Sequence, residues 1–416
     1  MRLANLVQDI AAQLRPSPTH EKAYQHTIGL FLTQINKQLQ ATHLKAKAVL
    51  GGSFAKGTWL AEEFDVDIFV LFDNSYPDTE LSDLLERALQ PFSPTRVHGS
   101  RDYYHINDKT IRYEIVPVTA IDKPEQARNV TDFSPLHVQW VQKNAGTLRD
   151  DIRVAKQWFK AQRLYGAESY LHGFSGHVLD ILVIHYKGFL ALLRKSKEWT
   201  APVILDPEKH YKGRILHHLN KSKTQGPLII VDPLDKTRNA AAAVGQNTFI
   251  RFKKQAQAFL DAPSADAFTL PVITIKELKT KADIIIEAKA KKGKVDVVGT
   301  KLYKVHEHLI RALQDFKIIT ADWHWKPGKT ALLWYTVKHH TLSKTKEVQG
   351  PPLNIKEAVK RFKQKHPRTY EKSGRLYATV NRTHRTPHST IQAALKSTYV
   401  TSRVMQTKIL KAPKDL

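Results

Sequence analysis

The chain has 416 residues, with 65 Lys and Arg against 39 Asp and Glu, so its formal net charge is +26. At 42% hydrophobic residues it can bury a large core, divided among about two to four domains at roughly 100–200 residues each. The lack of cysteine excludes disulfides, thiolate metal sites and a cysteine nucleophile. The first residues lack a signal-peptide layout and no apolar run approaches roughly 18–20 residues, so we expect a soluble cytoplasmic protein without a membrane partner.

The positive charge is concentrated in the last third of the chain. Residues 271–416 hold 31 Lys and Arg against 11 Asp and Glu, a net +20, whereas residues 1–270 hold 34 against 28, a net +6. Basic runs at 289–294 and 361–368 would neutralise phosphates and release counterions, which favours a nucleic-acid partner. A solvated basic surface is the plainer alternative. A membrane-surface helix is less favoured, because these lysines alternate with Val and Ile at strand-like spacing.

The periodicity predicts an α+β chain in three parts. Residues 1–145 read as a head in which a helix, capped by Ser17 and started by Pro18, precedes strands at 48–50, 64–72 and 111–116, the last ended by Pro117. Residues 146–262 read as a helical middle domain, with apolar stripes at 152–159 and 178–193. Residues 263–416 form a basic mixed body and tail, with strands at 284–286 and 331–337, helices at 306–316 and 355–362, and a hairpin turn at Pro327–Gly328.

A carboxylate motif is the strongest chemical signal in the head. Residues i and i+2 of a strand share a face, so Asp65 and Asp67 point the same way while Val66 packs on the other side. Parallel carboxylates repel each other, and a pair of Mg²⁺ ions would remove that penalty. Glu114 on the strand 111–116 supplies a third carboxylate, and Ser53 after the turn Gly51–Gly52 can present its hydroxyl and N–H to a phosphate.

The combination of these features is more specific than any one of them. A lone Asp-x-Asp is more often a solvated strand or turn. Gly-Ser followed after twelve residues by Asp65 and then Asp67, with a carboxylate strand further on, resembles the signature of nucleotidyltransferases like DNA polymerase β. A phosphate-loop ATPase fits poorly, because the order at 56–58 is Lys-Gly-Thr and the Gly328-Lys329-Thr330 run has Trp323 where the upstream glycine is required.

Several longer segments narrow the resemblance. In chain order they are GSFAKGTWLAEEFDVDIFVLF, SPLHVQW, AKQWFKAQRLYGAESYLHGFSG, VDPLDKTRN, GPPLNIKEAVKRF and GRLYATV. Together they resemble the archaeal-type, or class I, CCA-adding enzymes over nearly the whole chain. That resemblance implies template-independent addition of C, C and A to the tRNA 3′ end from CTP and ATP. It also implies contacts of the basic body with the acceptor and T-arm backbone.

The resemblance also implies roles for particular residues. It implies Asp65, Asp67 and Glu114 as catalytic ligands of two Mg²⁺ ions, Ser53 and Lys56 at the nucleotide, His137, Lys156 and Tyr165 at the triphosphate or sugar, and Arg238 as a base-reading residue. The third family carboxylate is usually aspartate, so Glu114 departs from the pattern. Its longer side chain would either require a strand set slightly further back or act mainly as a base for the 3′-hydroxyl.

Each of these residues also has a structural interpretation. Lys56 could be solvated, His137 a satisfied loop histidine, and Lys156 exposed on its helix. Tyr165 could pack before a helix stop at Gly166, and Arg238 could pair with Asp235 one turn back. We expect Trp158 to lie in the core. We expect no zinc site, because the chain has no cysteine and pairs such as His217–His218 are adjacent rather than on one helical face.

Two other functions compete with CCA addition. One is another template-independent RNA nucleotidyltransferase, such as a poly(A) polymerase, and the other is a tRNA-binding protein with an inactive head. The sequence leaves open how C addition changes to A addition and whether the chain dimerises through its tail.

Overall fold

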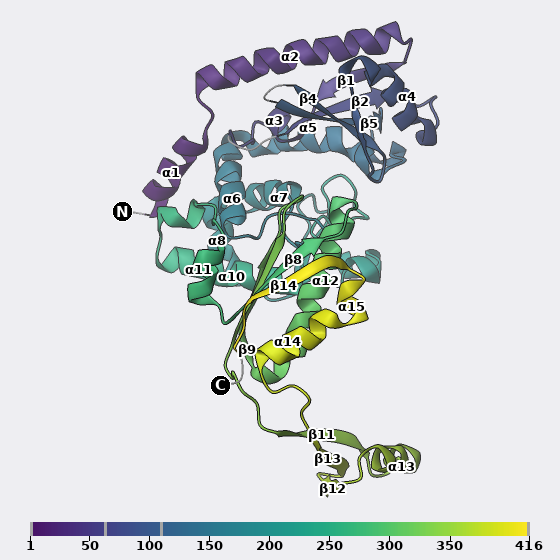
Figure 1. Ribbon diagram of the computed structural model, residues 1–416. Helices are drawn as coiled ribbons and strands as arrows, with labels where there is room; N and C mark the ends of the chain where they lie inside the picture. Colours follow the sequence, from purple (N-terminus) through teal and green to yellow (C-terminus); the bar gives the residue numbers. More distant parts are fainter. Residues whose placement is uncertain (1–2, 62–64, 109–110, 414–416) are drawn as a thin grey trace. The chain divides into compact units, whose positions relative to one another are not determined.

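The computed structural model describes residues 3–61, 65–108 and 111–413 (Figure 1). The chain divides into two compact units, Met1–Pro271 and Val272–Leu416. The mixed helix and strand content agrees with the expected α+β class. The finer three-part division expected from the sequence stays a prediction.

The first unit contains a five-stranded sheet in the order β1-β2-β5-β4-β3. The strands β2 and β5 are parallel and the other neighbours are antiparallel. One face packs against the helices α2 and α4, and the other carries a smaller cluster in which Phe69 and Val116 meet Val138 of α5 (Figure 1). The strands and these helices are β1 (Ala46–Leu50), β2 (Val66–Phe72), β3 (Thr95–Val97), β4 (Tyr103–Asp108), β5 (Ile111–Thr119), α2 (Pro18–Ala41), α4 (Leu81–Leu89) and α5 (Ser134–Ala145).

Local sequence signals explain most of these boundaries, and two expectations need correction. Ser17 caps α2 by accepting a hydrogen bond from the His20 N–H at 3.2 Å, and Pro18 is its first residue, as predicted. An earlier helix, α1 (Leu3–Leu14), was missed. Pro117 does not end β5, which continues to Thr119. A proline removes only one N–H donor from the ladder, and Pro117 still pairs with Val70 of β2. The predicted start of the second strand, Phe64, lies outside the described residues.

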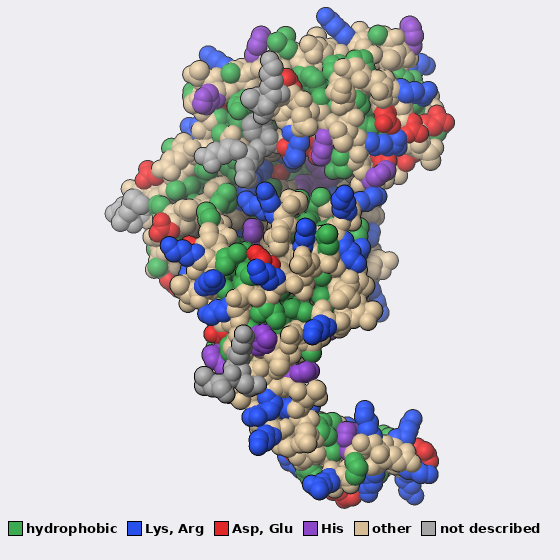
Figure 2. Space-filling view, in the orientation of Figure 1, with side chains coloured by type: hydrophobic (Ala, Val, Ile, Leu, Met, Phe, Trp, Pro, Cys, Tyr) green, Lys and Arg blue, Asp and Glu red, His purple; other side chains and the backbone are tan. Residues whose placement is uncertain are grey.

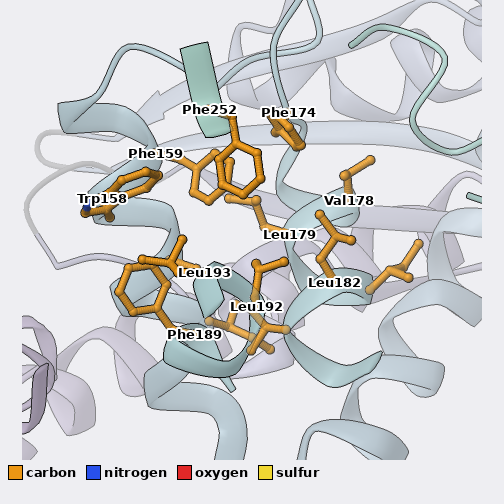
Figure 3. Packing of buried hydrophobic residues seen from close by; sticks show 14 of the residues in the cluster. Trp158, Phe159, Phe174, Val178, Leu179, Leu182, Phe189, Leu192, Leu193 and Phe252 are labelled. Carbon is orange, nitrogen blue, oxygen red and sulfur yellow. The ribbon is translucent and has the colours of Figure 1, made fainter. Parts of the chain in front are cut away.

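A helical layer completes the first unit around a core rich in aromatic side chains (Figure 3). Trp158 is fully buried there, as expected, and packs with Phe159, Phe189 and Phe252. The predicted stripe at 178–193 is two helices rather than one, because Lys187 and Gly188 both adopt positive φ and break it. The remaining elements are α3 (Gly52–Lys56), α6 (Arg149–Ala161), α7 (Gly176–Tyr186), α8 (Phe189–Ser196), β6 (Val203–Leu205), α9 (Ile215–His218), β7 (Leu228–Ile230) and α10 (Gln246–Asp261).

Among the described residues, no single helix has the length and apolar character needed to cross a membrane. The pair α7 and α8 reaches that length only together and is bent by 88°. Both helices contribute side chains to the aromatic core of the first unit.

The second unit is built on two further antiparallel sheets. The larger has the order β14-β8-β10-β9 and the smaller the order β11-β13-β12. Gly328, with φ of +77°, lies in the turn between β9 and β10, as predicted. The elements are α11 (Ile275–Lys281), β8 (Ile284–Ala290), α12 (Val295–Leu313), β9 (Ile318–His324), β10 (Ala331–Val337), β11 (Thr345–Pro352), α13 (Lys356–Lys365), β12 (Thr369–Lys372), β13 (Arg375–Asn381), α14 (Pro387–Lys396), α15 (Thr398–Thr401) and β14 (Val404–Lys411).

Of the basic residues in the two runs, only Lys289 lies on a strand, β8. Lys291, Lys292 and Lys294 lie in the connection from β8 to α12, and the run from Arg361 to Lys365 lies on α13. Apart from Lys289, the expectation of strand-like spacing was wrong, because the lysines at 291–294 lie in a connection and the apolar residues beside the lysines of α13 follow a helical period. Lys and Arg side chains crowd the surface over β11–β13 and α13 (Figure 2).

Candidate active site

The parallel pairing of β2 with β5 brings the predicted carboxylates together. Asp67 and Glu114 are register partners across these two strands, and Asp65 directly precedes β2. The alternation on β5 puts Tyr113 and Ile115 in the core, fully buried, and leaves Glu114 partly exposed on the opposite face, as predicted. The two strands thus present three carboxylates to one place.

The turn before α3 fits closely against this group. The Gly51 N–H donates to the Asp67 carbonyl at 2.8 Å. Gly52 has φ of +56°, and a Cβ at that position would lie 1.6 Å from Asp67 Oδ2. Only a residue without a side chain allows the turn to approach the carboxylate so closely, and that approach places Ser53 beside the acids.

The carboxylates repel one another and are partly removed from water. Burial, reinforced by the charge of Glu114, raises the pKa of Asp67 to about 7. Burial, followed by the charge of Asp65, also raises the pKa of Glu114. Burial and like charge together thus make it costly to keep all three carboxylates ionised at this place.

Two basic side chains accompany the acids. Arg112 pairs with Asp65 through both Nε, at 2.8 Å, and Nη2, and its side chain is half exposed. His105 Nε2 lies 3.4 Å from Glu114 Oε2. Asp67, the most strongly perturbed of the three acids, is the register neighbour of Glu114 and is not an acceptor in either pair.

A second set of charges comes from α3, α6 and α7. Lys56 Nζ lies 2.8 Å from Oδ2 of Asp180, and Lys156 Nζ lies 3.7 Å from Oδ1 of the same carboxylate. Lys156 also donates to the hydroxyl and the carbonyl of Thr58, at 3.0 and 3.2 Å. The alternative interpretation of Lys156 as an exposed side chain does not hold, since the residue is buried at 5% exposure. Lys56 likewise is not solvated but ion-paired.

A cavity of about 300 Å³ joins the two sets of charges. Its walls combine acidic, basic and aromatic side chains with one glycine, and they include every residue proposed from the sequence except His137 and Arg238. The lining residues are Ser53, Lys56, Asp65, Asp67, Glu114, Lys156, Tyr165, Gly176, His177 and Asp180. Burial raises the pKa of Tyr165 to about 12, so its hydroxyl is protonated at neutral pH.

His137 and Arg238 meet at a buried carboxylate next to the cavity. His137, on α5 rather than in a loop, points Nε2 at Asp232 Oδ1 at 2.9 Å, and the lining residue His177 points Nε2 at Oδ2 at 3.2 Å. Arg238 Nη1 lies 3.3 Å from Oδ2. The alternative side-chain pair of Arg238 with Asp235 is therefore not formed, and the partner is Asp232. Burial opposes ionisation of Asp232, but hydrogen bonds from both histidines hold its pKa far below the usual range.

Two groups of side chains have the chemistry of a cation site. The three carboxylates offer the hard oxygen ligands that Mg²⁺ and other hard divalent cations take, and a bound cation would offset the repulsion that contributes to the raised pKa values of Asp67 and Glu114. His137, His177 and Asp232 have ligand atoms within 4.8 Å of one another, a grouping that the adjacent-histidine argument overlooked. There, however, Arg238 and the N–H groups of Leu234 and Asp235 already supply positive partners to the carboxylate.

Sequence reasoning missed three of these residues. Asp180 is the one acidic residue of the apolar helix α7, GHVLDILVIHY. A single acid among buried apolar residues indicates a charge with a partner elsewhere in the fold, and this signal could have been used. Asp232 and His177 carry no comparable signal, because their importance arises from contacts over 95 and 55 positions in the chain.

Comparisons with known proteins agree with this geometry. Residues 32–136 match the nucleotidyltransferase domain family, residues 150–269 the family described as tRNA nucleotidyltransferase, second domain, and residues 282–409 that described as CCA-adding enzyme, C-terminal domain. A CCA-adding enzyme of Nanoarchaeum equitans is 35% identical over 345 residues, covering 80% of this chain and 83% of that protein. One of Methanothermobacter thermautotrophicus is 27% identical over 87% of this chain and 82% of its own length.

The similarity to solved structures concerns the fold alone. A structure of Cid1, an RNA terminal uridylyl transferase, has a TM-score of 0.50 and 13% identity, covering 65% of this chain and 98% of that one. At that identity the likeness shows the nucleotidyltransferase fold and nothing about the substrate. The matches over all three segments, together with the relative at 35% identity, show that the chain belongs to the CCA-adding enzymes, a family of tRNA nucleotidyltransferases.

Proposed function

We propose that this protein adds C, C and A to the 3′ end of tRNA, using CTP and ATP without a template and releasing pyrophosphate. The observation that carries this proposal is the cavity in which three carboxylates lie together with the two lysines Lys56 and Lys156. Nucleotidyl transfer needs both kinds of group, one to organise cations and the other to offset phosphate charge.

The carboxylates are proposed to hold the cations. Asp65, Asp67 and Glu114 would bind Mg²⁺, which when present activates the attacking hydroxyl and neutralises the triphosphate. The all-oxygen ligand set and the raised pKa of Asp67 support this assignment. Glu114, one methylene longer than the usual aspartate, still lies directly across from Asp67.

The remaining lining residues are proposed to bind the nucleotide. Ser53 and Lys56 would contact the phosphates from the turn and from α3, and Lys156 and Tyr165 from the side of α6. His137 and Arg238 do not line the cavity, so their roles at the triphosphate and at the base depend on their shared partner Asp232, which also holds the lining residue His177.

The basic second unit is proposed to retain the tRNA backbone. Residues 271–416 carry a net charge of +20, and the helix α13 exposes a run of basic side chains. Such a surface binds phosphates without reading sequence, which suits an enzyme that must accept every tRNA. Whether two chains associate through this unit is a separate question.

The test is nucleotide choice on tRNA that lacks its 3′ end. With labelled CTP alone we expect limited C addition, and with CTP plus ATP we expect a complete CCA end that is not extended further. An enzyme that adds only adenylate would incorporate no label from CTP. A protein with an inactive head would bind the tRNA but show no metal-dependent incorporation.

A further inference from the structure

Asp180 is a buried acid that the proposed function does not yet use. It lies on α7, is 1% exposed and occupies a helix whose other buried residues are apolar. Its carboxylate lies between the amines of Lys56 on α3 and Lys156 on α6. One side chain thus joins cationic groups from two elements that are about 100 residues apart in sequence.

Stability alone is a poor reason for such an arrangement. Removing a carboxylate from water costs several kcal/mol, and packed apolar groups of similar volume often serve the fold as well or better. Among the described residues, Oδ1 of Asp180 has no hydrogen-bond partner, and the amine of Lys156 lies 3.7 Å from it. A buried carboxylate oxygen left in this way requires an explanation beyond packing.

The two ammonium groups favour the ionised form of Asp180, and Asp180 in turn favours the protonated form of Lys156. Burial alone would raise the pKa of Asp180, but the ammonium groups of Lys56 and Lys156 outweigh it and hold that pKa below its usual range. Burial lowers the pKa of Lys156, and the charge of Asp180 opposes that change. The carboxylate therefore helps a fully desolvated amine to stay protonated.

The place of these three residues in the cavity wall indicates which ligand the two amines meet. Lys56, Lys156 and Asp180 all line it, together with the three carboxylates that would repel a triphosphate. A lysine ammonium has three donors, so Lys56 can keep its contact with Asp180 and still donate to a phosphate oxygen. Lys156 already donates twice to Thr58, so it would exchange one of those hydrogen bonds for a phosphate oxygen or act on the phosphate by its charge alone.

We propose that Asp180 is a positioning residue that holds the amines of Lys56 and Lys156 ready for the phosphates of the incoming nucleotide. This inference rests on the proposed function, since it assigns the amines to a triphosphate. Asp180 itself touches neither the nucleotide nor the tRNA. It acts by fixing two cations before the anion arrives, so that binding does not have to order them.

The experiment compares Asp180→Asn with the unchanged protein in nucleotide binding that requires no turnover. The probe is CTP in which a methylene group replaces the oxygen between the α and β phosphorus atoms. We expect Asp180→Asn to bind it about tenfold more weakly, the loss of one hydrogen bond between charged groups, and we expect its tRNA affinity to be unchanged. In turnover, KM for CTP should rise more than kcat falls. The matched control is Glu198→Gln, which removes a carboxylate from the exposed pair with Lys195 and should change nothing.

A second pair of variants separates positioning from structure. In a Lys56→Met background, Asp180→Asn should weaken binding less than it does alone, because one of the two amines it holds is gone. If Asp180→Asn does not fold, Asp180→Glu keeps the charge, and its affinity for the probe should lie nearer to that of the unchanged protein than that of Lys56→Met does.

The inference is overturned if Asp180→Asn binds the probe as tightly as the unchanged protein. It is also overturned if probe affinity, tRNA affinity and melting temperature all fall together, or if the two substitutions are simply additive. Failure of the proposed function is a different result, namely that the unchanged protein adds no C to tRNA, and the probe measurement does not depend on it.

Discussion

The two units of the chain use charge in opposite ways. In the first unit, Arg101, Asp132, Lys156, Asp180 and Asp232 are all buried. In the second, no Lys, Arg, Asp or Glu among the described residues is buried, and the buried polar residues there are His306 and Thr386. Yet the second unit carries most of the net charge, +20 against +6.

We relate this difference to the two proposed tasks, the chemical step in the first unit and the retention of tRNA by the second. Charges taken out of water interact strongly and are hardly screened, so a few of them can shift a pKa or fix a phosphate. Exposed charges are screened beyond about 8 Å at physiological salt, and they act by number, through the release of counterions. We therefore expect single substitutions to be decisive in the first unit and only groups of substitutions to matter in the second.

The largest effect is expected at Asp67. Asp67→Ala removes the most perturbed carboxylate of the cavity, so nucleotide incorporation should fall on the order of 10³-fold, while tRNA retention stays nearly unchanged. Incorporation of labelled CTP and a filter-binding assay measure the two quantities. The matched control is Asp73→Asn, an exposed acid directly after the far end of the same strand. Incorporation by Asp67→Ala near the unchanged level would refute the division between the units.

Much of the catalytic region could be predicted from local patterns. The alternation around Asp65 and Asp67, and again around Glu114, fixes which side chains share a face, and Pro18 and Ser17 fix the start of α2. The alternation does not predict that β2 pairs with β5. That neighbourhood followed from the family resemblance, because the two strands are separated by other elements in the chain.

The local interpretations of Lys156 and Arg238 fail for the same physical reason. Lys156 looks exposed on a helical period, yet Thr58 and Asp180, from distant segments, bury and pair it. Arg238 looks paired within its own turn, yet the buried carboxylate of Asp232 lies closer. Local spacing describes one element at a time, whereas a desolvated charge takes whichever partner the tertiary fold supplies.

The next largest effect should come from the basic helix α13. Changing four exposed residues together, Lys360, Arg361, Lys363 and Lys365, to Gln should weaken tRNA binding about 10- to 100-fold and reduce the salt slope by up to about four units. Incorporation at saturating tRNA should be retained. Binding curves at several salt concentrations check both values. Four exposed lysines of the first unit, Lys22, Lys37, Lys45 and Lys47, give the control, and an equal loss there would erase the contrast between the units.

A smaller effect is expected from pH. Since burial raises the pKa of Asp67 to about 7, the metal-free protein holds a proton there below that pH, and a divalent cation must displace it. Affinity for Mn²⁺ should therefore rise about tenfold per unit as pH increases toward 7 and level off above it. Calorimetric titrations between about pH 5.5 and 8.5 measure this. Asp67→Asn should lose the slope, and an unchanged slope in that variant would assign the proton to another group.

The same raised pKa has a consequence for stability. Between the ordinary value of 3.8 and about 7 the folded, metal-free protein binds more protons at Asp67 than the unfolded chain does. The contribution of this residue to the free energy of unfolding must then fall as pH rises through that window and stay constant above it. Denaturation in the presence of a chelator measures this. As pH rises through that window, the free energy of unfolding of the unchanged protein should fall relative to that of Asp67→Asn.

The smallest effect is expected at Arg112, which is half exposed and pairs with the lining residue Asp65. A cation bound by Asp65 has to compete with that guanidinium, but an exposed ion pair is worth only about 0.2–1 kcal/mol. Arg112→Gln should therefore tighten Mn²⁺ binding about two- to fivefold, with the melting temperature nearly unchanged. Weaker Mn²⁺ binding in this variant would mean that Arg112 orients Asp65 for the cation instead of competing with it. The exposed pair of Arg112 with Asp65 would then act together with the buried charges of the first unit.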